Sequence, residues 1–377
     1  MKVAIVTLPL HTNYGGLLQA YALKTSLENL GHEVTVLDLE DKMPGPVALK
    51  APFVYARRML RRLVSGSNAP EVFRERRFKA ELPIVGANTK LFIDRCINPR
   101  VLKSYRHVDV NEYDAFVVGS DQVWRPLYFP GVENAFLAFT EGWDVKRIAY
   151  AASFGTAELE YETLQLERCT GLLKEFDAVS VREECGIRMC SEWFDREDAK
   201  HLLDPVMLLD ADCYKTIAQT VKDRPAKGKV VTYILDKTSH KQSVAEYISR
   251  ISGLQLHDVS INPYDRTVPV EDRVAPHLEQ WLAGFTDADF VVTDSFHGCV
   301  LSIMLHKRFI VVGNSSRGIA RMQSLVDMFG LDQRLVQGID PEDDGEFFMS
   351  DPDWEQVDSV LDEKRQECLE FLKSNLK

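Results

Sequence analysis

The residues best suited to chemistry stand at a break between an apolar, β-branched run and a helical pattern: Ser295, Phe296, His297 and Gly298. The pattern predicts a strand, a tight turn and the start of a helix. In open α/β sheets ligands bind outside the carboxyl ends of strands, and the N–H groups and dipole of a helix start favour anions. A histidine there can bind a phosphate or transfer a proton, or it can simply cap the turn.

A second group follows the first apolar run and consists of Asn13, Tyr14, Gly15, Gly16 and Gln19. A glycine pair at a strand-to-helix junction lets the backbone approach a ligand closely, and the helix start can hold negative charge. The spacing matches neither G-x-G-x-x-G nor a phosphate-binding Lys-Ser/Thr loop. A tight turn without a ligand is therefore an equal alternative.

A third group, Ser120, Asp121, Gln122 and Trp124, follows another apolar run. The first three side chains can form hydrogen bonds to hydroxyl groups, and the tryptophan offers a face on which a sugar could stack. A helix N-cap at Ser120 or Asp121 would explain part of the pattern without function.

Two more strand ends carry the residues Ser153, Phe154 and Gly155, and then Arg182 and Glu183. Arginine is the preferred bidentate partner of carboxylate and phosphate, although a lone arginine at a strand end is often a surface ion pair. Asp204, in Leu203-Asp204-Pro205-Val206, is interpreted as a strand terminus followed by a turn.

The elements that must position these residues alternate between short β-rich runs and helical patterns, which predicts parallel sheets. The first set of strands is expected at 3–7, 34–39, 115–119, 148–153, 178–181 and 202–206, with helices near 16–30 and 160–174. After the breaker-rich stretch 223–228, strands are expected at 230–235, 254–259, 290–293 and 309–312, with helices near 241–252 and 320–329.

This rhythm predicts an α/β protein with two Rossmann-like domains facing a cleft. We place the N-terminal domain at 1–224, with a basic insert at about 41–109. The C-terminal domain is placed at 225–352. A closing helix is expected within 353–377 and could pack on either domain.

The composition is that of a globular chain long enough for two cores, with 377 residues, 45% hydrophobic and 27% charged. No stretch approaches the length of apolar sequence that a membrane span needs, and residues 1–6 are too short for the core of a signal peptide, so we expect a cytoplasmic protein. Seven scattered cysteines without a C-x-x-C pair predict reduced thiols and no metal site.

The net charge of −12 conceals a basic segment, 50–106, with 14 Lys or Arg against four acidic residues. Such a segment predicts an acidic partner: anionic lipid headgroups, a diphosphate-linked substrate or the acidic face of another subunit. Nucleic acid is not expected for an acidic chain. Within the segment, residues 55–63 form an amphipathic pattern that predicts a helix, which lies either at the inner face of the membrane or, solvated, on the protein body.

Taken in order, N-Y-G-G-L-L-Q-A-Y-A-L, V-G-S-D-Q-V-W, S-F-G-T, S-V-R-E, D-P-V and T-D-S-F-H-G resemble the polysaccharide pyruvyl transferase family, from residue 2 to about 331. The resemblance implies a fold similar to the GT-B glycosyltransferases. It also implies transfer of a pyruvyl group from phosphoenolpyruvate, a co-substrate rather than a cofactor, to a sugar as a cyclic ketal.

The resemblance further implies roles for Arg182 and His297 in donor binding and catalysis, with Ser295, Phe296 and Gly298 around them. Some members of the family carry an arginine where this chain has Ser295. Arg317 and Arg321 are candidates to replace that cation, or they are cations on a helix surface. We assign His297 as the general acid or as a hydrogen-bond donor to the departing phosphate. Asp121 or Glu183 would orient the sugar hydroxyl. The resemblance thus puts the acceptor on the side of the N-terminal domain and the donor anion on the side of the C-terminal domain.

The acceptor would be a sugar of a capsule or exopolysaccharide, or its lipid-linked precursor. Two alternatives stay open. One is a sugar-nucleotide glycosyltransferase on the same architecture, because fold does not fix the donor. The other is a non-catalytic protein of sugar binding or assembly, which the serine at position 295 would favour.

Overall fold

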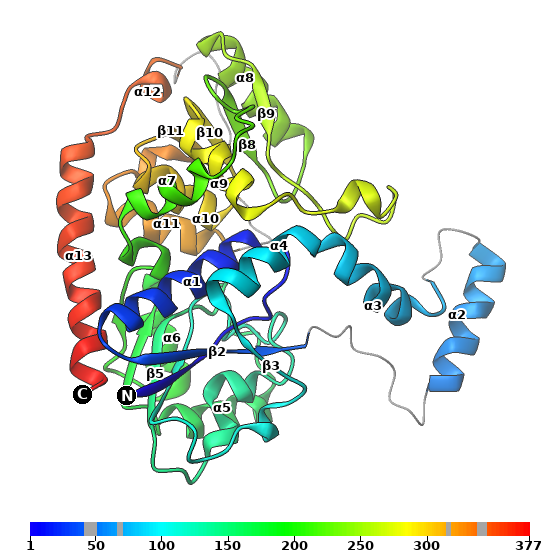
Figure 1. Cartoon of the computed structure of the whole chain (residues 1–377), viewed down its shortest axis with the longest axis vertical. Coiled ribbons are helices and arrows are strands. Elements are labelled where there is room, and N and C mark those ends of the chain that lie inside the picture. Colours follow the sequence, from blue (N-terminus) through cyan, green and yellow to red (C-terminus); the bar gives the residue numbers. More distant parts are fainter. Residues whose placement is uncertain (41–50, 66–70, 314–317, 338–344) are drawn as a thin grey trace.

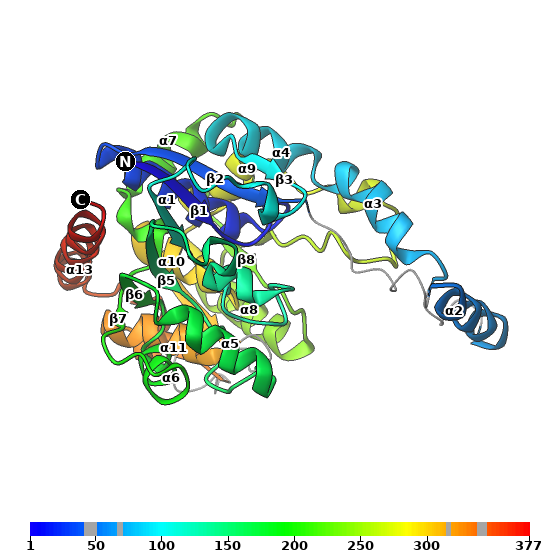
Figure 2. The same cartoon turned by 90° about the horizontal axis from the view of Figure 1, so that it is seen from below.

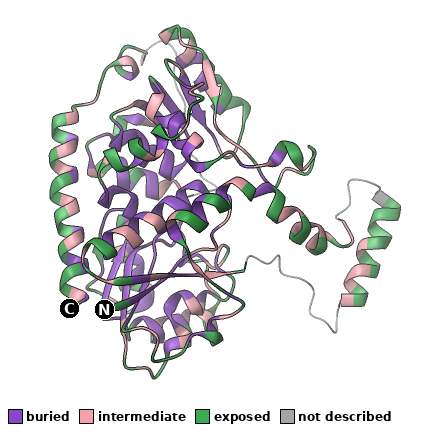
Figure 3. Ribbon diagram, viewed as in Figure 1, coloured by how far each residue is buried: buried purple, intermediate pink, exposed green. Residues whose placement is uncertain are grey.

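The structure, a computed structural model, describes residues 1–40, 51–65, 71–313, 318–337 and 345–377. Two parallel β-sheets, each packed against helices, follow one another along the chain (Figure 1). Apolar side chains fill the layers between sheets and helices, which is the region coloured as buried in Figure 3. This is the α/β architecture that the alternating sequence pattern predicts.

The first sheet has the strand order β3-β2-β1-β4-β5-β6-β7, with all neighbouring strands parallel. Its inner strands are buried on both faces, which is why they read as continuous apolar runs. The strands are β1 (Lys2–Val6), β2 (Glu33–Leu39), β3 (Arg100–Leu102), β4 (Ala115–Val118), β5 (Lys146–Ala152), β6 (Ala178–Val181) and β7 (Lys200–His201). The helices of this part are α1 (Tyr14–Asn29), α5 (Thr163–Leu173) and α6 (Glu184–Phe194).

The second sheet has the order β12-β11-β10-β8-β9 and is also parallel. Its strands are β8 (Val230–Tyr233), β9 (Leu256–Asp258), β10 (Phe290–Thr293), β11 (Arg308–Val312) and β12 (Leu335–Val336). The helices that follow the first sheet are α7 (Ala211–Gln219), α8 (Ser239–Ser252), α9 (Leu278–Asp287), α10 (Phe296–Met304), α11 (Ile319–Met328) and α12 (Gly345–Met349). Two Rossmann-like units with a C-terminal helix make up the GT-B-like architecture expected from the sequence.

Both sheets reverse their strand order at a point that faces the other sheet. In the first sheet this point lies between β1 and β4, and in the second between β8 and β10. Such a reversal leaves a crevice at the carboxyl ends of the two strands, because the following connections leave in opposite directions. The segments after β1, β4, β8 and β10 are therefore positioned to build a site.

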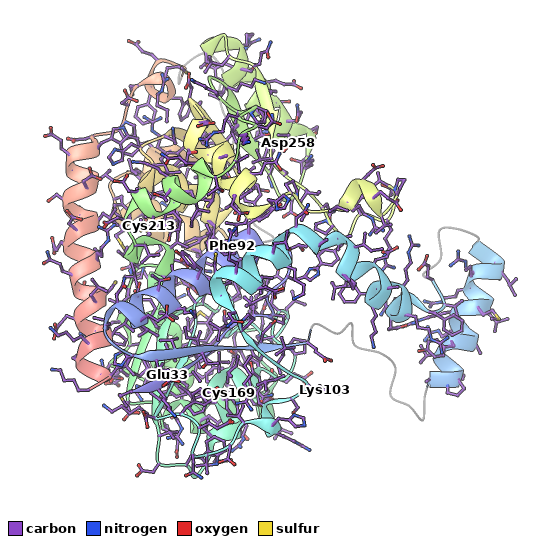
Figure 4. All side chains as sticks on the ribbon, in the orientation of Figure 1. Glu33, Phe92, Lys103, Cys169, Cys213 and Asp258 are labelled. Carbon is purple, nitrogen blue, oxygen red and sulfur yellow. The ribbon has the colours of Figure 1, made fainter. Side chains whose placement is uncertain are left out.

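The basic insert consists of helices and one short strand. Helix α2 (Ala51–Ser65) projects away from the body, and α3 (Arg74–Val85) and α4 (Ala87–Phe92) lead back to it (Figure 1). A π-helical turn (Ile93–Ile97) precedes the edge strand β3. Phe92, labelled in Figure 4, is fully buried and packs edge-on against Tyr21 of α1, with ring centroids 5.6 Å apart, so the end of the insert is anchored in the core.

Helix α13 (Trp354–Asn375) corresponds to the closing helix that the sequence predicts, and it contacts both units. Near its start, the ring of Trp354 stacks on His306 of the second unit at 4.8 Å. Near its end, Phe371 contacts Tyr150 of β5 at 6.3 Å, and Lys146 donates a hydrogen bond to the carbonyl of Asn375 at 2.9 Å. The helix thus runs along both units, on the side opposite α2 (Figure 2).

Two expectations need correction or stay open. The strand expected at 202–206 is wrong, because β7 ends at His201 and Pro205, which has no N–H for a sheet hydrogen bond, opens a 3₁₀ turn (Pro205–Leu208). The boundary at residue 224 stays a prediction, although α7 already packs against α9 of the second unit. None of the helices in the described ranges is both long enough and apolar enough to span a bilayer.

Candidate active site

A cleft of about 610 Å³ lies between the two sheets, where the segments after β1, β4, β8 and β10 meet. Its buried part, which we call the floor, is lined by polar and charged side chains and by rings, and its more exposed part, which we call the mouth, is lined by Phe78, Tyr128 and Tyr264. The lining includes Asn13, Tyr14, Phe78, Asp121, Gln122, Tyr128, Tyr233, Tyr264, Asp294, Ser295, Phe296, His297 and Arg321. The two switch points of the sheets therefore share one site.

Arg182 holds two carboxylates together beneath this floor. Its Nη1 lies 2.8 Å from Asp204 Oδ2 and its Nη2 lies 3.1 Å from Asp121 Oδ1, with its side chain only 1% exposed. The guanidinium also lies 4.2 Å from the centre of the Phe296 ring, which belongs to α10 of the second unit. Arg182 is not one of the described residues that line the cleft, because Phe296 and the two aspartates surround its side chain.

His297, in the first turn of α10, reaches across to the first unit. Its Nε2 lies 3.6 Å from Asp204 Oδ2, which is an ion-pair distance and too long for a good hydrogen bond. That nitrogen is buried and has no hydrogen-bond partner among the described residues. The other side of the ring lies against Gly15, where an added Cβ would be 2.1 Å from His297 Nδ1. Gly15 is therefore required because the imidazole occupies the space of a side chain.

Asp204 is fixed by its own surroundings. Its Oδ1 accepts a hydrogen bond from the backbone N–H of Val206 at 3.0 Å, so it caps the 3₁₀ turn. Ser120 Oγ lies 3.2 Å from Asp204 Oδ2 and 2.7 Å from the carbonyl of Ala151. The carboxylate is thus oriented toward His297 and Arg182.

The charges of the cluster determine its protonation. Burial would raise the pKa of Asp121, but the positive charges of Arg182 and His297 outweigh burial and hold that pKa below its usual value. Burial would also raise the pKa of Asp204, but His297 and Arg182 hold that pKa well below the ordinary range. For Arg321, burial and the nearby charge of Arg182 lower the pKa to about 10. At neutral pH both carboxyls and both guanidinium groups are therefore charged.

Asp294 organises the wall of the cleft formed by the second unit. It accepts hydrogen bonds from the backbone N–H groups of Leu235 at 2.6 Å and Asp236 at 3.0 Å, and from Nζ of Lys241 at 2.7 Å. The lysine is itself buried. This buried pair fixes the segment after β8 against the end of β10, so that wall is held rigidly.

Several predicted site residues do lie at the cleft. From the first unit these are Asn13, Tyr14, Asp121 and Gln122, and Asn13 Nδ2 donates a hydrogen bond to Asp121 Oδ2 at 3.3 Å. From the second unit they are Ser295, Phe296, His297 and Arg321, with Ser295 Oγ accepting from the N–H of Gly298 at 3.4 Å as the N-cap of α10. Arg317 lies outside the described residues.

Other predicted residues support the site from behind. Gln19 is fully buried, accepts the N–H of Ser120 at 2.8 Å and donates to Thr7 Oγ1 at 2.8 Å, so it joins the residues that follow β1 and β4. An added Cβ at Gly298 would lie 2.3 Å from Thr293 Oγ1, which explains the glycine by close packing.

Two roles proposed from the sequence need correction. Trp124 is fully buried, stacked on Phe136 at 4.9 Å, and its Nε1 donates to the carbonyl of Ala135, so its ring is not available to a sugar. Glu183 is also fully buried. Its Oε1 accepts hydrogen bonds from Ser153 Oγ and from the N–H groups of Phe154 and Gly155, at 3.0, 2.8 and 3.2 Å. Glu183 thus orders the loop after β5 rather than a substrate hydroxyl.

The sequence interpretation missed three features of the site. Asp204 was interpreted as a turn residue, although the D-P-V motif marked its position. Lys241 lies in a helix with no distinguishing motif. Phe78 lies in the insert, where the sequence pattern does not assign clear helices and strands. Tyr264 stacks against Phe78 with ring centroids 6.2 Å apart at the mouth of the cleft. Among the described residues, no group of three or more His, Cys, Asp or Glu is arranged to hold a metal ion.

Solved structures with a related arrangement are remote in sequence. UDP-GlcNAc 2-epimerase from Neisseria meningitidis, bound to UDP-GlcNAc, is 12% identical over 98% of this chain and 94% of its own, with a TM-score of 0.44. MurG from Acinetobacter baumannii is 11% identical over 99% and 98%, with a TM-score of 0.41. UGT89C1 from Arabidopsis thaliana, complexed with UDP, is 9% identical over 99% and 98%, with a TM-score of 0.48. Likenesses of this degree carry no information on the activity of this chain.

Comparison of the sequence with known families gives a more specific result. No curated protein matches the chain. The family model described as polysaccharide pyruvyl transferase matches residues 13–316, which is most of the chain. That match begins at Asn13 on the first wall of the cleft and extends past the His297 turn on the second wall. The chain therefore belongs to the polysaccharide pyruvyl transferase family.

Proposed function

We propose that this transferase moves a pyruvyl group from phosphoenolpyruvate to two hydroxyls of one sugar, giving a pyruvate ketal and inorganic phosphate. The acceptor would be a sugar of a cell-surface polysaccharide, or its lipid-linked precursor at the inner face of the membrane. Membership of the family supports pyruvyl transfer to a polysaccharide. The observation that carries the proposal further is the pairing of His297 with the buried carboxylate of Asp204 at the floor of the cleft.

The donor would bind on the wall formed by the second unit. Phosphoenolpyruvate carries a phosphate and a carboxylate, which require cations and N–H donors. Arg321 of α11 lines the cleft, with its guanidinium 5.9 Å from the centre of the Phe296 ring, and α10 begins beside it. Arg321 thus supplies a cation on the cleft wall that contains Ser295. Arg182 lies behind Phe296 and positions the two aspartates instead of contacting the donor.

His297 would act on the donor as a general acid. Ketal formation needs a proton on the methylene carbon, which converts the enol phosphate of the donor into an oxocarbenium-like carbon. The carboxylate of Asp204, 3.6 Å from Nε2, would hold the imidazole in position for this step. An imidazolium in the same position can alternatively donate a hydrogen bond to the departing phosphate.

Asp121 would orient the acceptor. Because its pKa is held low, it is a carboxylate at neutral pH and can accept a hydrogen bond from a sugar hydroxyl. It lines the cleft from the first unit, where Oδ1 accepts from Arg182 and Oδ2 from Asn13, and each oxygen has a second lone pair for a hydroxyl. The acceptor would therefore enter between the aromatic residues at the mouth and reach the donor carbon from the side of the first unit.

The proposed reaction forms two C–O bonds to the sugar and breaks one C–O bond to phosphate. One sugar hydroxyl attacks the oxocarbenium-like carbon and loses its proton, and the C–O bond to phosphate then breaks. A second hydroxyl of the same sugar attacks the carbon again and loses its proton. The methylene group has gained one proton and become a methyl group, and the other proton leaves with the phosphate.

The test is an assay of phosphate release and product mass with phosphoenolpyruvate and a panel of simple and lipid-linked glycosides. A ketal adds the mass of pyruvate minus water. His297→Ala should lower the rate by about 10²-fold or more, the usual contribution of a positioned general acid. The matched control is His240→Ala, on the exposed face of α8. A His297→Ala variant with the wild-type rate would refute the role of the histidine.

The same assay separates the alternatives. A mass gain of a hexose from a sugar nucleotide, without pyruvate, would identify a glycosyltransferase. Sugar binding without turnover of any donor would identify a binding protein. Either result would overturn the proposed reaction.

A further inference from the structure

Helix α2 exposes its apolar face instead of burying it. Phe53, Leu60 and Val64 are 74%, 63% and 87% exposed and lie seven and four residues apart, so they share one face. Met59 and Leu63, 53% and 78% exposed, lie beside them. A helix on the surface of a globular protein normally turns such a stripe toward the core. Figure 3 shows α2 without buried residues among those described.

The opposite edge of α2 is the one that packs on the protein. Arg58 Nη1 lies 2.7 Å from Glu75 Oε1 of α3 and donates to the carbonyl of Val72 at 3.1 Å. The ring of Tyr55 contacts that of Phe73, with centroids 5.0 Å apart. Tyr55 and Arg58 are three residues apart and share the packed edge. The orientation of α2 is therefore fixed by contacts, and these contacts direct the apolar face outward.

The charges of α2 indicate what covers that face. Residues 51–65 contain four arginines and no acidic residue. Arg57 and Arg61 are exposed beside the apolar face, and Arg62 is exposed on the edge of Tyr55 and Arg58. Two copies of the chain that paired through α2 would bring these arginines together and repel one another. An anionic lipid surface takes up both groups, with acyl chains for the apolar residues and headgroups for the arginines.

We propose that α2 docks the protein on a membrane containing anionic lipids, lying in the interface with Phe53, Leu60, Leu63 and Val64 inserted and its arginines among the headgroups. Helix α3 connects this surface with the cleft. Glu75 of α3 holds α2, and Phe78, one turn later, lines the mouth of the cleft. Docking thus places the mouth beside the lipid surface. If the proposed function holds, a lipid-linked sugar would reach the cleft from that surface.

The experiment is co-sedimentation of the full chain with vesicles, in the absence of donor and acceptor. Vesicles of phosphatidylcholine alone are compared with vesicles that also contain phosphatidylglycerol, at low and raised salt. We expect binding to the anionic vesicles only, weakened by salt. Arg57→Gln and Arg61→Gln should each weaken binding about fivefold. The control for these is Arg188→Gln, on the exposed face of α6.

The apolar face is tested by the double variant Leu60→Glu/Leu63→Glu, which should abolish vesicle binding. Its control is Leu164→Glu, since Leu164 is 80% exposed on α5. Equal binding of the double variant and the wild type would overturn the proposal. So would an absence of vesicle binding together with a wild-type dimer that the double variant loses, because a second copy would then cover the face. Since no turnover is measured, failure here leaves the pyruvyl transfer untouched, and an inactive His297→Ala variant should still bind vesicles.

Discussion

Asp204 and His297 belong to different units of the fold, yet His297 Nε2 lies 3.6 Å from Asp204 Oδ2 inside a buried cluster. One residue follows the last strand of the first sheet, and the other opens the helix after β10 of the second sheet. The proton-transfer group of the proposed reaction is therefore supported by the unit opposite to its own. The packing between the two units at this pair thus also positions the proposed general acid.

We expect Asp204→Asn to lower kcat by about 10²-fold, because the amide lacks the negative charge that faces the proposed general acid. Asparagine keeps the oxygen that accepts from Val206, so the fold should persist, with a stability loss of about 3 kcal/mol from the half-compensated charge of Arg182. Steady-state phosphate release and thermal unfolding measure the two effects. The control is Asp198→Asn, whose side chain is 68% exposed. Unchanged kcat in a folded Asp204→Asn enzyme would contradict the assigned role.

Gly15→Ala should displace the His297 ring, since the new Cβ would lie 2.1 Å from Nδ1. A displacement of about 1 Å of a catalytic group costs on the order of 10²-fold in rate. The matched control is Gly171→Ala in α5, where an added Cβ meets nothing within 4 Å. The control should be as active as the wild type and slightly more stable, because alanine is the better helix former. Equal activity of the two variants would show that the contact does not position the imidazole.

Arg321→Gln should raise the KM for phosphoenolpyruvate about 10- to 100-fold, which is the effect of losing a hydrogen bond to a charged group. The kcat should change far less, because the proposed role is binding. Initial rates over a range of donor concentrations separate the two constants, with Arg188→Gln on the surface of α6 as control. A fall in kcat at constant KM would assign Arg321 to the chemical step instead.

The stability of the protein should fall in acid through the same cluster. The pKa values of Asp121 and Asp204 are depressed in the fold, so the unfolded chain binds protons first. Their contribution to the free energy of unfolding is complete above the unfolded value of about 3.9 and is lost as the pH falls through the folded values. Urea unfolding between about pH 6 and pH 3 should show a smaller decline for Asp204→Asn than for the wild type. Equal declines in the free energy of unfolding would show that Asp204 does not contribute to the loss of stability in acid.

The predicted sheets agree closely with the structure where the sequence signal is local. Exposing a run of β-branched residues that is buried on both faces would cost free energy of burial. Strands such as β6 and β10 therefore begin and end where the pattern does. The position of His297 at the start of a helix can be predicted for the same reason, since the turn and the helix start are encoded within a few residues.

The roles of Trp124, Glu183 and Asp204 could not be predicted in this way. Each depends on partners that are distant in sequence. Trp124 is buried because Phe136 and Phe154 surround it, and Glu183 is used by the loop after β5, about 30 residues earlier. Asp204 gains its significance only when His297, 93 positions later, is brought beside it. A sequence motif records the position of such a residue and not the charge that it faces.

Helix α13 has a mechanical consequence for substrate entry. A helix of 22 residues is a rod of about 33 Å, and this one is fastened to His306 of one unit and to Tyr150 of the other. A rod fixed at both ends keeps the two units at constant separation along their common side. Helix α3, whose Phe78 lines the cleft, lies on the side opposite α13. We therefore expect any rotation of one unit relative to the other to occur about α13 and to widen the cleft on the side of Phe78.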